Sequence, residues 1–368
     1  MIQLEVNGQK FEGFIEASCK KSMDTFCSKF YFTASTETQA FADYPIKRGA
    51  LVKVIVDDNT WITGRIEELE VNYDDSKMTV QMHGRDVTSD ILDSTIGPKI
   101  AINGPITLKR LIERVLSLSG ITGIQVIDSV GGIEQFTETD ILQPDIGSPV
   151  HSFIENYARM RQVLLITNAD GNIEITRGKT DTVSGDLKNV IDELNNIVSA
   201  KARFSDIRRF NQYVVHGQSN FSVLSWEGEG IEQATNKAAT ATDDAIPTSR
   251  VKHIMAETPL NTQQAQERAN WEANIGRARS IEYTCKVDGH SLEGLAFDIN
   301  QVRKIVDDYA GVNAEMLCNK VEISTDATGN YSMLSFVSKD AYNTNPVATS
   351  KQKAVNDVGV IWNNSNFE

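Results

Sequence analysis

Cysteine is scarce in this chain, and its distribution argues against a disulfide framework. Only four cysteines occur among 368 residues, and no two of them form a CxxC pair. They are Cys19, Cys27, Cys285 and Cys318. Cysteines scattered this widely are typical of reduced structural thiols, so we expect a chain that is synthesised in the cytoplasm.

Long apolar runs are missing too, which bears on membranes and export. No stretch reaches the roughly 20 apolar residues of a membrane-spanning helix, and we expect no membrane segment. Residues 1–14 have neither a basic flank nor an apolar core, so we expect no secretory signal. Asn7-Gly8 within them is a type I′ turn signal and predicts an opening hairpin.

Clustered positive charge is also absent. The chain carries 36 Lys and Arg residues against 50 Asp and Glu residues, which gives a formal net charge of −14. Broad binding of phosphate backbones needs clustered cations. The composition therefore disfavours a nucleic-acid-binding protein.

Motifs for catalysis are likewise missing. There is no GxSxG, no HExxH and no phosphate-binding glycine loop, and the five histidines lack the spacing of metal ligands. We interpret Asp57-Asp58 and Asp74-Asp75 as turn residues, because adjacent strand residues point to opposite faces and cannot flank one substrate bond. A histidine brought close in space to one of the first two cysteines stays an open alternative. We predict no enzymatic activity, no cofactor and no metal.

The clearest pattern that is present lies in residues 51–93, which predict three antiparallel strands. Val52, Val54 and Val56 alternate with other residues, as expected for a strand with one buried face. In the second strand the apolar phase slips by one residue near Glu67-Glu68, which predicts a β-bulge. A bent meander of this kind is most simply part of a small antiparallel barrel.

The same pattern recurs late in the chain. Residues 304–308 echo 54–58, and residues 321–326 echo 69–74. Residues 331–340 echo the third strand, with Lys339-Asp340 where Arg85-Asp86 stands. Three echoes in one order predict an internal duplication.

A short polar motif closes the first meander. In Gly84-Arg85-Asp86, a glycine ends the strand and a fixed pair of opposite charges would orient the connector that follows. An ordinary solvated turn explains the motif equally well. The candidate structural corner residues are Gly64, Gly84, Arg85, Asp86 and Asp93.

The order of patterns predicts a mainly β fold with α+β insertions. We expect a first β-barrel domain over 1–95 and a small α+β domain over 96–184, where an amphipathic stripe indicates helices. A second, similar antiparallel β-barrel domain should cover 185–342, interrupted by a loop and helix insertion at 226–280. Within the insertion, residues 226–250 have no period and predict a long loop, and 262–278 predict a helix. Residues 343–368 predict a polar tail ordered only by a partner.

An ordered set of short strings extends over most of the chain, outside residues 226–250 and the tail. It includes Thr63-Gly64-Arg65-Ile66, His83-Gly84-Arg85-Asp86, Asp90 to Ser94, Tyr213 to Gln218, and Arg268 to Glu272. In this order the chain resembles the baseplate hub family of contractile-tailed phages, the Mu-type tail protein P, which is similar to the T-even hub. One departure is Phe297, because the family usually places a Trp in the string that aligns with residues 294–300.

The resemblance implies a structural hub in the virion, at the baseplate of the tail, made in the cytoplasm of the bacterial host. It implies a homotrimer whose ring adapts a six-fold tail tube to a three-fold central spike. The partners implied are the central spike protein and the tail tube or tube-initiator protein, with the tape measure protein as a further candidate. DNA would be present only in transit through the lumen. The alternatives are the hub of a type VI secretion or tailocin-like injection machine and, less favoured, a carbohydrate-binding β-protein.

Overall fold

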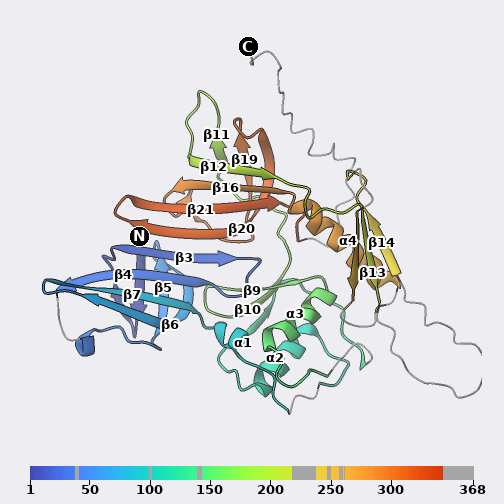
Figure 1. Cartoon of the computed structure of the whole chain (residues 1–368), viewed down its shortest axis with the longest axis horizontal. Coiled ribbons are helices and arrows are strands. Elements are labelled where there is room, and N and C mark those ends of the chain that lie inside the picture. Colours follow the sequence, from blue (N-terminus) through green and yellow to red (C-terminus); the bar gives the residue numbers. More distant parts are fainter. Residues whose placement is uncertain are drawn as a thin grey trace, which may run out of the picture.

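The computed structural model describes residues 1–37, 41–98, 102–138, 143–217, 238–246, 250–256, 260 and 262–342. Figure 1 shows two β regions lying side by side, a smaller helical region next to the first of them, and an insertion beside the second. The predicted polar tail, 343–368, lies outside the described residues.

The first β region comes from the N-terminal quarter of the chain and includes one short 3-10 helix, η1 (Phe41–Asp43). Its strands are β1 (Ile2–Val6), β2 (Gln9–Phe11), β3 (Glu16–Ser22), β4 (Lys29–Glu37), β5 (Leu51–Val56), β6 (Asn59–Tyr73) and β7 (Lys77–Asp86). The predicted bulge in the second strand of the meander is confirmed, because the pairing of β6 with β7 shifts register between Ile66 and Glu68.

The helical region has its own hydrophobic core and a three-stranded sheet in the order β8-β10-β9. Its elements are α1 (Ser89–Asp93), α2 (Leu108–Leu118), β8 (Val126–Asp128), α3 (Val150–Met160), β9 (Leu164–Thr167) and β10 (Ile173–Thr176). The amphipathic stripes that predicted α2 and α3 correspond to apolar faces that are buried, including Leu111 of α2 and Ile154 of α3.

The second β region returns to the pattern of the first. Its strands are β11 (Leu187–Asn189), β12 (Ile197–Phe204), β16 (Ile281–Asp288), β17 (Ser291–Leu292), β18 (Leu295–Ala296), β19 (Val302–Asp307), β20 (Val312–Asp326) and β21 (Gly329–Ser338). No helix among the described residues is both long enough and apolar enough to cross a membrane.

The two β regions form one continuous sheet rather than two separate sheets. The sheet has 13 strands, with the main path β12-β16-β21-β20-β3-β4-β7-β6-β5-β1-β2 and with β11 and β19 off this path. The predicted mainly β fold with α+β insertions is confirmed. Among the described residues, however, the strand pairing closes no barrel, because the main path ends at β12 and β2, which do not pair with each other; the two regions are joined where β20 pairs with β3.

The insertion is more ordered than the sequence predicted. It contains β14 (Ala238–Thr242), β15 (Val251–Met255) and α4 (Thr262–Ala278), and both of its strands pair with β13 (Gln212–His216), which precedes it in the chain. The predicted helix is confirmed, but the prediction of a loop over all of 226–250 is wrong, since β14 pairs with β13. Small side chains explain the error: Ala239 and Ala241 of β14 pack against alanines of α4, and such a strand carries little hydrophobic signal. Residues 218–237 lie outside the described part of the chain.

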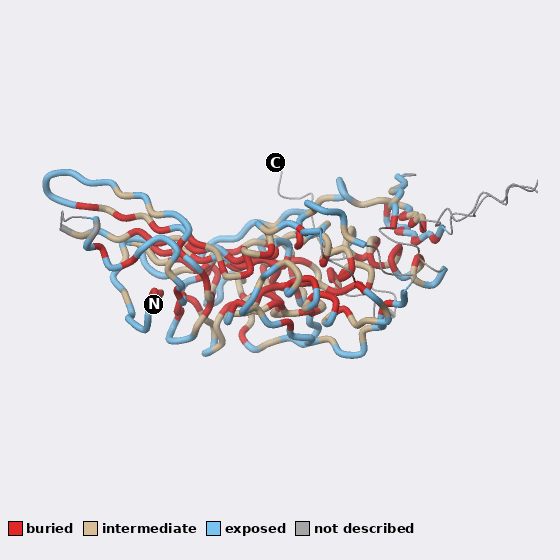
Figure 2. Tube along the Cα trace, turned by 90° about the horizontal axis from the view of Figure 1, so that it is seen from below, coloured by how far each residue is buried: buried red, intermediate tan, exposed pale blue. Residues whose placement is uncertain are grey.

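Burial follows the shared sheet through the middle of the molecule. Figure 2 shows buried segments running through the centre, while the far end of the β6–β7 hairpin projects beyond them. Residues 67–73 of β6 are exposed or only half-buried. This projecting edge is one half of the candidate site described next.

Candidate functional site: the free edges of the β regions

The candidate corner residues have different surroundings: Gly64 and Gly84 pack against Phe30, Arg85 pairs with Asp93, and Asp86 is buried. Gly64 and Gly84 lie under the ring of Phe30, and a Cβ at either position would come within 3.0 Å of that ring. Gly84 pairs with Phe30 across β4 and β7. The two glycines therefore make room for a buried aromatic ring, a role that their spacing in the sequence did not indicate.

Arg85 does not pair with Asp86, and the predicted fixed pair of adjacent charges is wrong. Arg85 donates from Nη1 and Nη2 to Asp93 at 3.1 and 2.5 Å, and from Nε to Glu67 at 2.6 Å. The hydrogen bonds from Arg85 hold the pKa of Asp93 below its usual range. Adjacent strand residues point to opposite faces, so Arg85 lies at the surface while Asp86 is buried.

Asp86 is the centre of a buried polar cluster. Its carboxylate accepts hydrogen bonds from the backbone N–H of Ser28 at 2.6 Å and of Thr88 at 3.0 Å, and from the hydroxyl of Thr167 at 2.8 Å. The Thr88 hydroxyl and the Cys27 thiol donate as well. Burial, and then the nearby carboxylate, raise the pKa of Cys27, so the thiol stays protonated and can donate. The cluster ties β4, β7, α1 and β9 together, and we propose that it sets the direction in which the chain leaves β7.

The predicted duplication is confirmed at the level of strands. The meander β5-β6-β7 has strands of 6, 15 and 10 residues, and β19-β20-β21 has the same three lengths. Both long strands carry a register shift against the next strand, after Ile66 in β6 and after Cys318 in β20. The bulges align residue 66 with 318 and, through the pairing, Arg85 with Val337 rather than with Lys339.

The equivalence extends to two further strands in each β region, β3 and β4 in the first and β12 and β16 in the second. The first unit pairs in the order β3-β4-β7-β6-β5, and the second pairs in the order β12-β16-β21-β20-β19. Every one of these neighbouring pairs is antiparallel. We call these two sets of strands the β units.

Within one chain, the two β units join edge to edge. Residues 320–325 of β20 pair with residues 17–22 of β3, so that Glu322 lies opposite Lys20 and Ile323 opposite Cys19. The Lys20 ammonium lies 3.2 Å from the Glu322 carboxylate. Cys19 and Ile323 are both buried in the common core.

The junction uses one edge of each unit, β20 of the second and β3 of the first. In each case the equivalent edge of the other unit is not used by the junction. The equivalent of β20 is β6, and among the described residues no strand pairs with the outer side of 68–73. The equivalent of β3 is β12, which is the terminal strand of the main sheet path. The sequence missed these edges, because nothing in a strand pattern shows which side of a strand lacks a neighbour.

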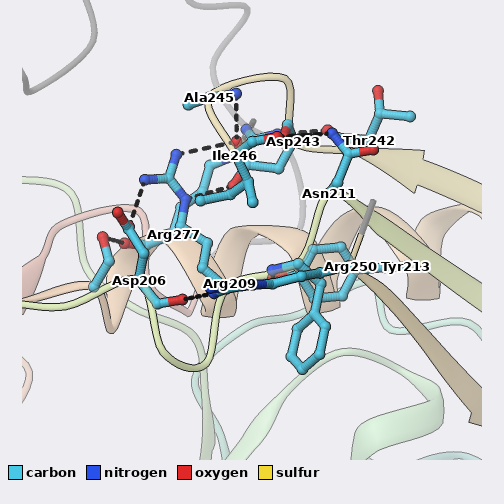
Figure 3. Close-up of polar contacts among 12 residues, drawn as sticks. Asp206, Arg209, Asn211, Tyr213, Thr242, Asp243, Ala245, Ile246, Arg250 and Arg277 are labelled. Carbon is cyan, nitrogen blue, oxygen red and sulfur yellow. Dashed lines mark hydrogen bonds and ion pairs between the residues drawn. The ribbon is translucent and has the colours of Figure 1, made fainter. Parts of the chain in front are cut away.

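The segment that follows β12 is fixed by ion pairs and hydrogen bonds. Arg209 donates to Asp206 at 3.1 Å and to the buried carboxylate of Asp243 at 2.5 and 3.0 Å (Figure 3). The guanidinium of Arg250 donates to the backbone oxygen of Asp206 at 2.9 Å. Arg277 of α4 reaches Asp243 at 3.4 Å from the other side. The chain that leaves β12 is therefore fixed to the insertion.

Residues suited to chemistry are not gathered anywhere in the described part of the chain. No cluster of three or more His, Cys, Asp or Glu side chains there is arranged to hold a metal ion. All four cysteines are buried and free. Trp61 and Trp271 are buried, and the other two tryptophans lie outside the described residues, so no stacking platform for sugars can be built from the first two.

The fold that these units build is that of phage tail proteins. The chain superposes on the 43 kDa tail protein of prophage MuSo2 from Shewanella oneidensis with a TM-score of 0.78 and 26% identity, covering 93% of this chain and 99% of that one. It also superposes on the tail protein from Neisseria meningitidis MC58 with a TM-score of 0.77 and 15% identity, covering 93% and 97%.

Two sequence comparisons narrow the class. Residues 1–86 match the family described as Mu phage baseplate assembly protein GpP-like, N-terminal. The chain is 22% identical over 326 residues to baseplate hub protein gp44 of Escherichia phage Mu, covering 88% of this chain and 83% of that protein. Together with the structural match to the MuSo2 protein, these findings support a phage baseplate hub-type protein. The predicted resemblance is confirmed.

Proposed function

We propose that this chain is a structural, non-enzymatic hub of a contractile phage tail and that it assembles as a ring of three copies. The observation that carries the proposal is the junction of β20 with β3, where two equivalent β units are already joined edge to edge. In the described part of the chain, one edge of each kind has no strand paired with it. Three chains supply six similar units, so the ring can face a six-fold tail tube on one side and a three-fold spike on the other.

The partners of such a ring follow from its position in the tail. We propose the central spike protein on one face and the tail tube or tube-initiator protein on the other, with the tape measure protein as a further candidate. The ring would belong to the baseplate of the virion. Its lumen would let DNA pass without holding it, since Asp and Glu outnumber Lys and Arg by 50 to 36 and a net charge of −14 repels phosphates.

Mass measurement of the full chain in solution tests the ring. We expect light scattering over a wide range of protein concentrations to give the mass of three copies. The same measurement should be made with the central spike protein of the same tail added, because spike binding can drive the association. A mass of one chain at every concentration with and without the spike, or a stable pair of chains, would contradict the ring.

One alternative is supported by fold. The chain superposes, at 8% identity and a TM-score of 0.56, on an E. coli protein described as a component of the type VI secretion system. A hub of a type VI or tailocin-like injection machine would use the same ring. Mass spectrometry of purified particles separates the alternatives, because the phage hub must co-purify with tails attached to DNA-filled heads.

A further inference from the structure

We propose that residues 68–73 of β6 add to residues 200–205 of a neighbouring copy, the second half of β12 and the residue after it, as an antiparallel strand pair in the register of the internal β20–β3 junction. This inference rests on the proposed ring and names the surface that closes it. The partner is a second copy of this chain. At each contact one copy contributes the edge of β6 and its neighbour contributes the edge of β12.

The register follows from the equivalence of the two β units. The bulges align residues 68–73 with 320–325. The pairing of β4 with β7 and of β16 with β21 aligns β4 with β16, and the pairing of β3 with β4 and of β12 with β16 then aligns 17–22 with 200–205. Transferring the internal register places Glu70 opposite Arg203 and Val71 opposite Ala202 of the neighbour. Leu69 then lies opposite Phe204.

The chemistry of the two edges matches in this register. Glu70 and Arg203 would repeat the internal pair of Glu322 with Lys20, which is 3.2 Å long. Val71 and Ala202 would repeat the buried pair of Ile323 with Cys19, and both already pack at the margin of the common core. Cross-strand pairs of these kinds each stabilise a sheet by about 0.2–1 kcal/mol, in addition to the backbone hydrogen bonds of the new ladder.

Residues of the free edges are more exposed than the equivalent residues of the internal junction. Val321, Ile323 and Ser324 of β20 are buried, whereas the equivalent residues of β6 are half-buried or exposed. Ala17 of β3 is buried, whereas its equivalent, Ala200 of β12, is exposed. Large apolar side chains are also exposed on and around β12 and at the end of β6: Ile191, Leu194, Val198, Phe204, Ile207 and Tyr73. Exposed apolar groups gathered at an unpaired strand edge are typical of an interface.

Charge selects a head-to-tail contact over a contact between two identical edges. The free edge of β6 carries Glu68 and Glu70, while that of β12 carries Lys201 and Arg203. Pairing β6 with β6, or β12 with β12, would bring like charges together across the strands, which is destabilising. A contact between different edges repeats around a ring and closes it.

A cysteine pair tests the register. In Val71→Cys/Ala202→Cys, the new thiols would lie directly opposite each other, with Cα atoms about 4.5–5.5 Å apart, a separation that a disulfide can bridge. Under mild oxidation we expect pairs and triples of chains on a non-reducing gel, because the native cysteines are buried. Neither single variant should cross-link, nor should the register-shifted Asn72→Cys/Ala202→Cys. A cross-link in the single Val71→Cys variant would indicate a contact between identical edges and overturn the inference.

A charge swap provides a second test at exposed positions, although Arg203→Glu also removes the 3.9 Å contact of Arg203 with Glu282 in the same chain. Glu70→Lys and Arg203→Glu should each weaken the association several-fold, and the double variant should restore it. If the wild-type chain has the mass of three copies but the cysteine pair does not cross-link and the swap has no effect, the ring stands and this interface is wrong. If no ring forms with or without the spike, the proposed function fails together with the interface.

Discussion

Replacing Asp86 by alanine is expected to lower the free energy of unfolding by about 3–5 kcal/mol, a severe loss for a single substitution. The carboxylate is 1% exposed and accepts from Ser28, Thr88 and Thr167. Alanine would leave these buried donors without an acceptor, and each unsatisfied donor costs about 1–3 kcal/mol unless water enters to replace the bond.

The measurement is urea unfolding of the wild type and the variant at equal protein concentration, since assembly would add to the apparent stability. Asp181→Ala is the matched control, because Asp181 is an exposed loop carboxylate. The control should unfold like the wild type. A loss below about 1 kcal/mol in Asp86→Ala would show that the cluster does not tie the α+β region to the first β unit.

Gly84→Ala should destabilise the chain by about 3 kcal/mol for a different reason, which is steric. The added Cβ would come within 3.0 Å of the Phe30 ring and of the backbone oxygen of Arg65. The ring is 3% exposed and packed in the core, so it cannot swing away freely. The backbone oxygen belongs to the neighbouring strand, β6, and can move only if the sheet is distorted.

Thermal unfolding of Gly84→Ala beside Gly97→Ala checks this prediction. A Cβ at Gly97 meets no atom within 4 Å, so that control should keep the wild-type midpoint. Adding Phe30→Leu to Gly84→Ala should recover part of the loss, because a smaller side chain relieves the clash with the ring but not the clash with Arg65. A midpoint for Gly84→Ala equal to that of the control would show that the sheet accommodates the methyl group.

The glycine pair also marks where the two β units have diverged. The residues equivalent to Gly64 and Gly84 are Met316 and Phe336, and the residue equivalent to Phe30 is Tyr283. In the first unit two glycines leave space for one aromatic ring. In the second unit larger side chains stand at both glycine positions. The sequence echoes did not show this exchange, because they compare positions one at a time.

The sequence by itself determined the elements whose signal is local. Alternating valines predicted β5, a slip in the apolar phase predicted the bulge in β6, and an amphipathic stripe predicted α2. Each rests on a period of two or 3.6 residues, which the chain displays before it folds. The order of short strings likewise led to the resemblance to phage baseplate hubs, which the comparisons support.

Only the tertiary structure decided how these elements meet. It showed that Arg85 pairs with Glu67 and Asp93, that Asp86 is buried under donors from distant segments, and that β20 joins β3. Apart from Arg85 and Asp93, which are eight positions apart, these contacts join residues tens to hundreds of positions apart, and packing rather than local pattern selects the partners. The free edges of β6 and β12 depended on the tertiary structure even more. An edge is free when no strand pairs with it, and only the folded sheet shows which strands pair.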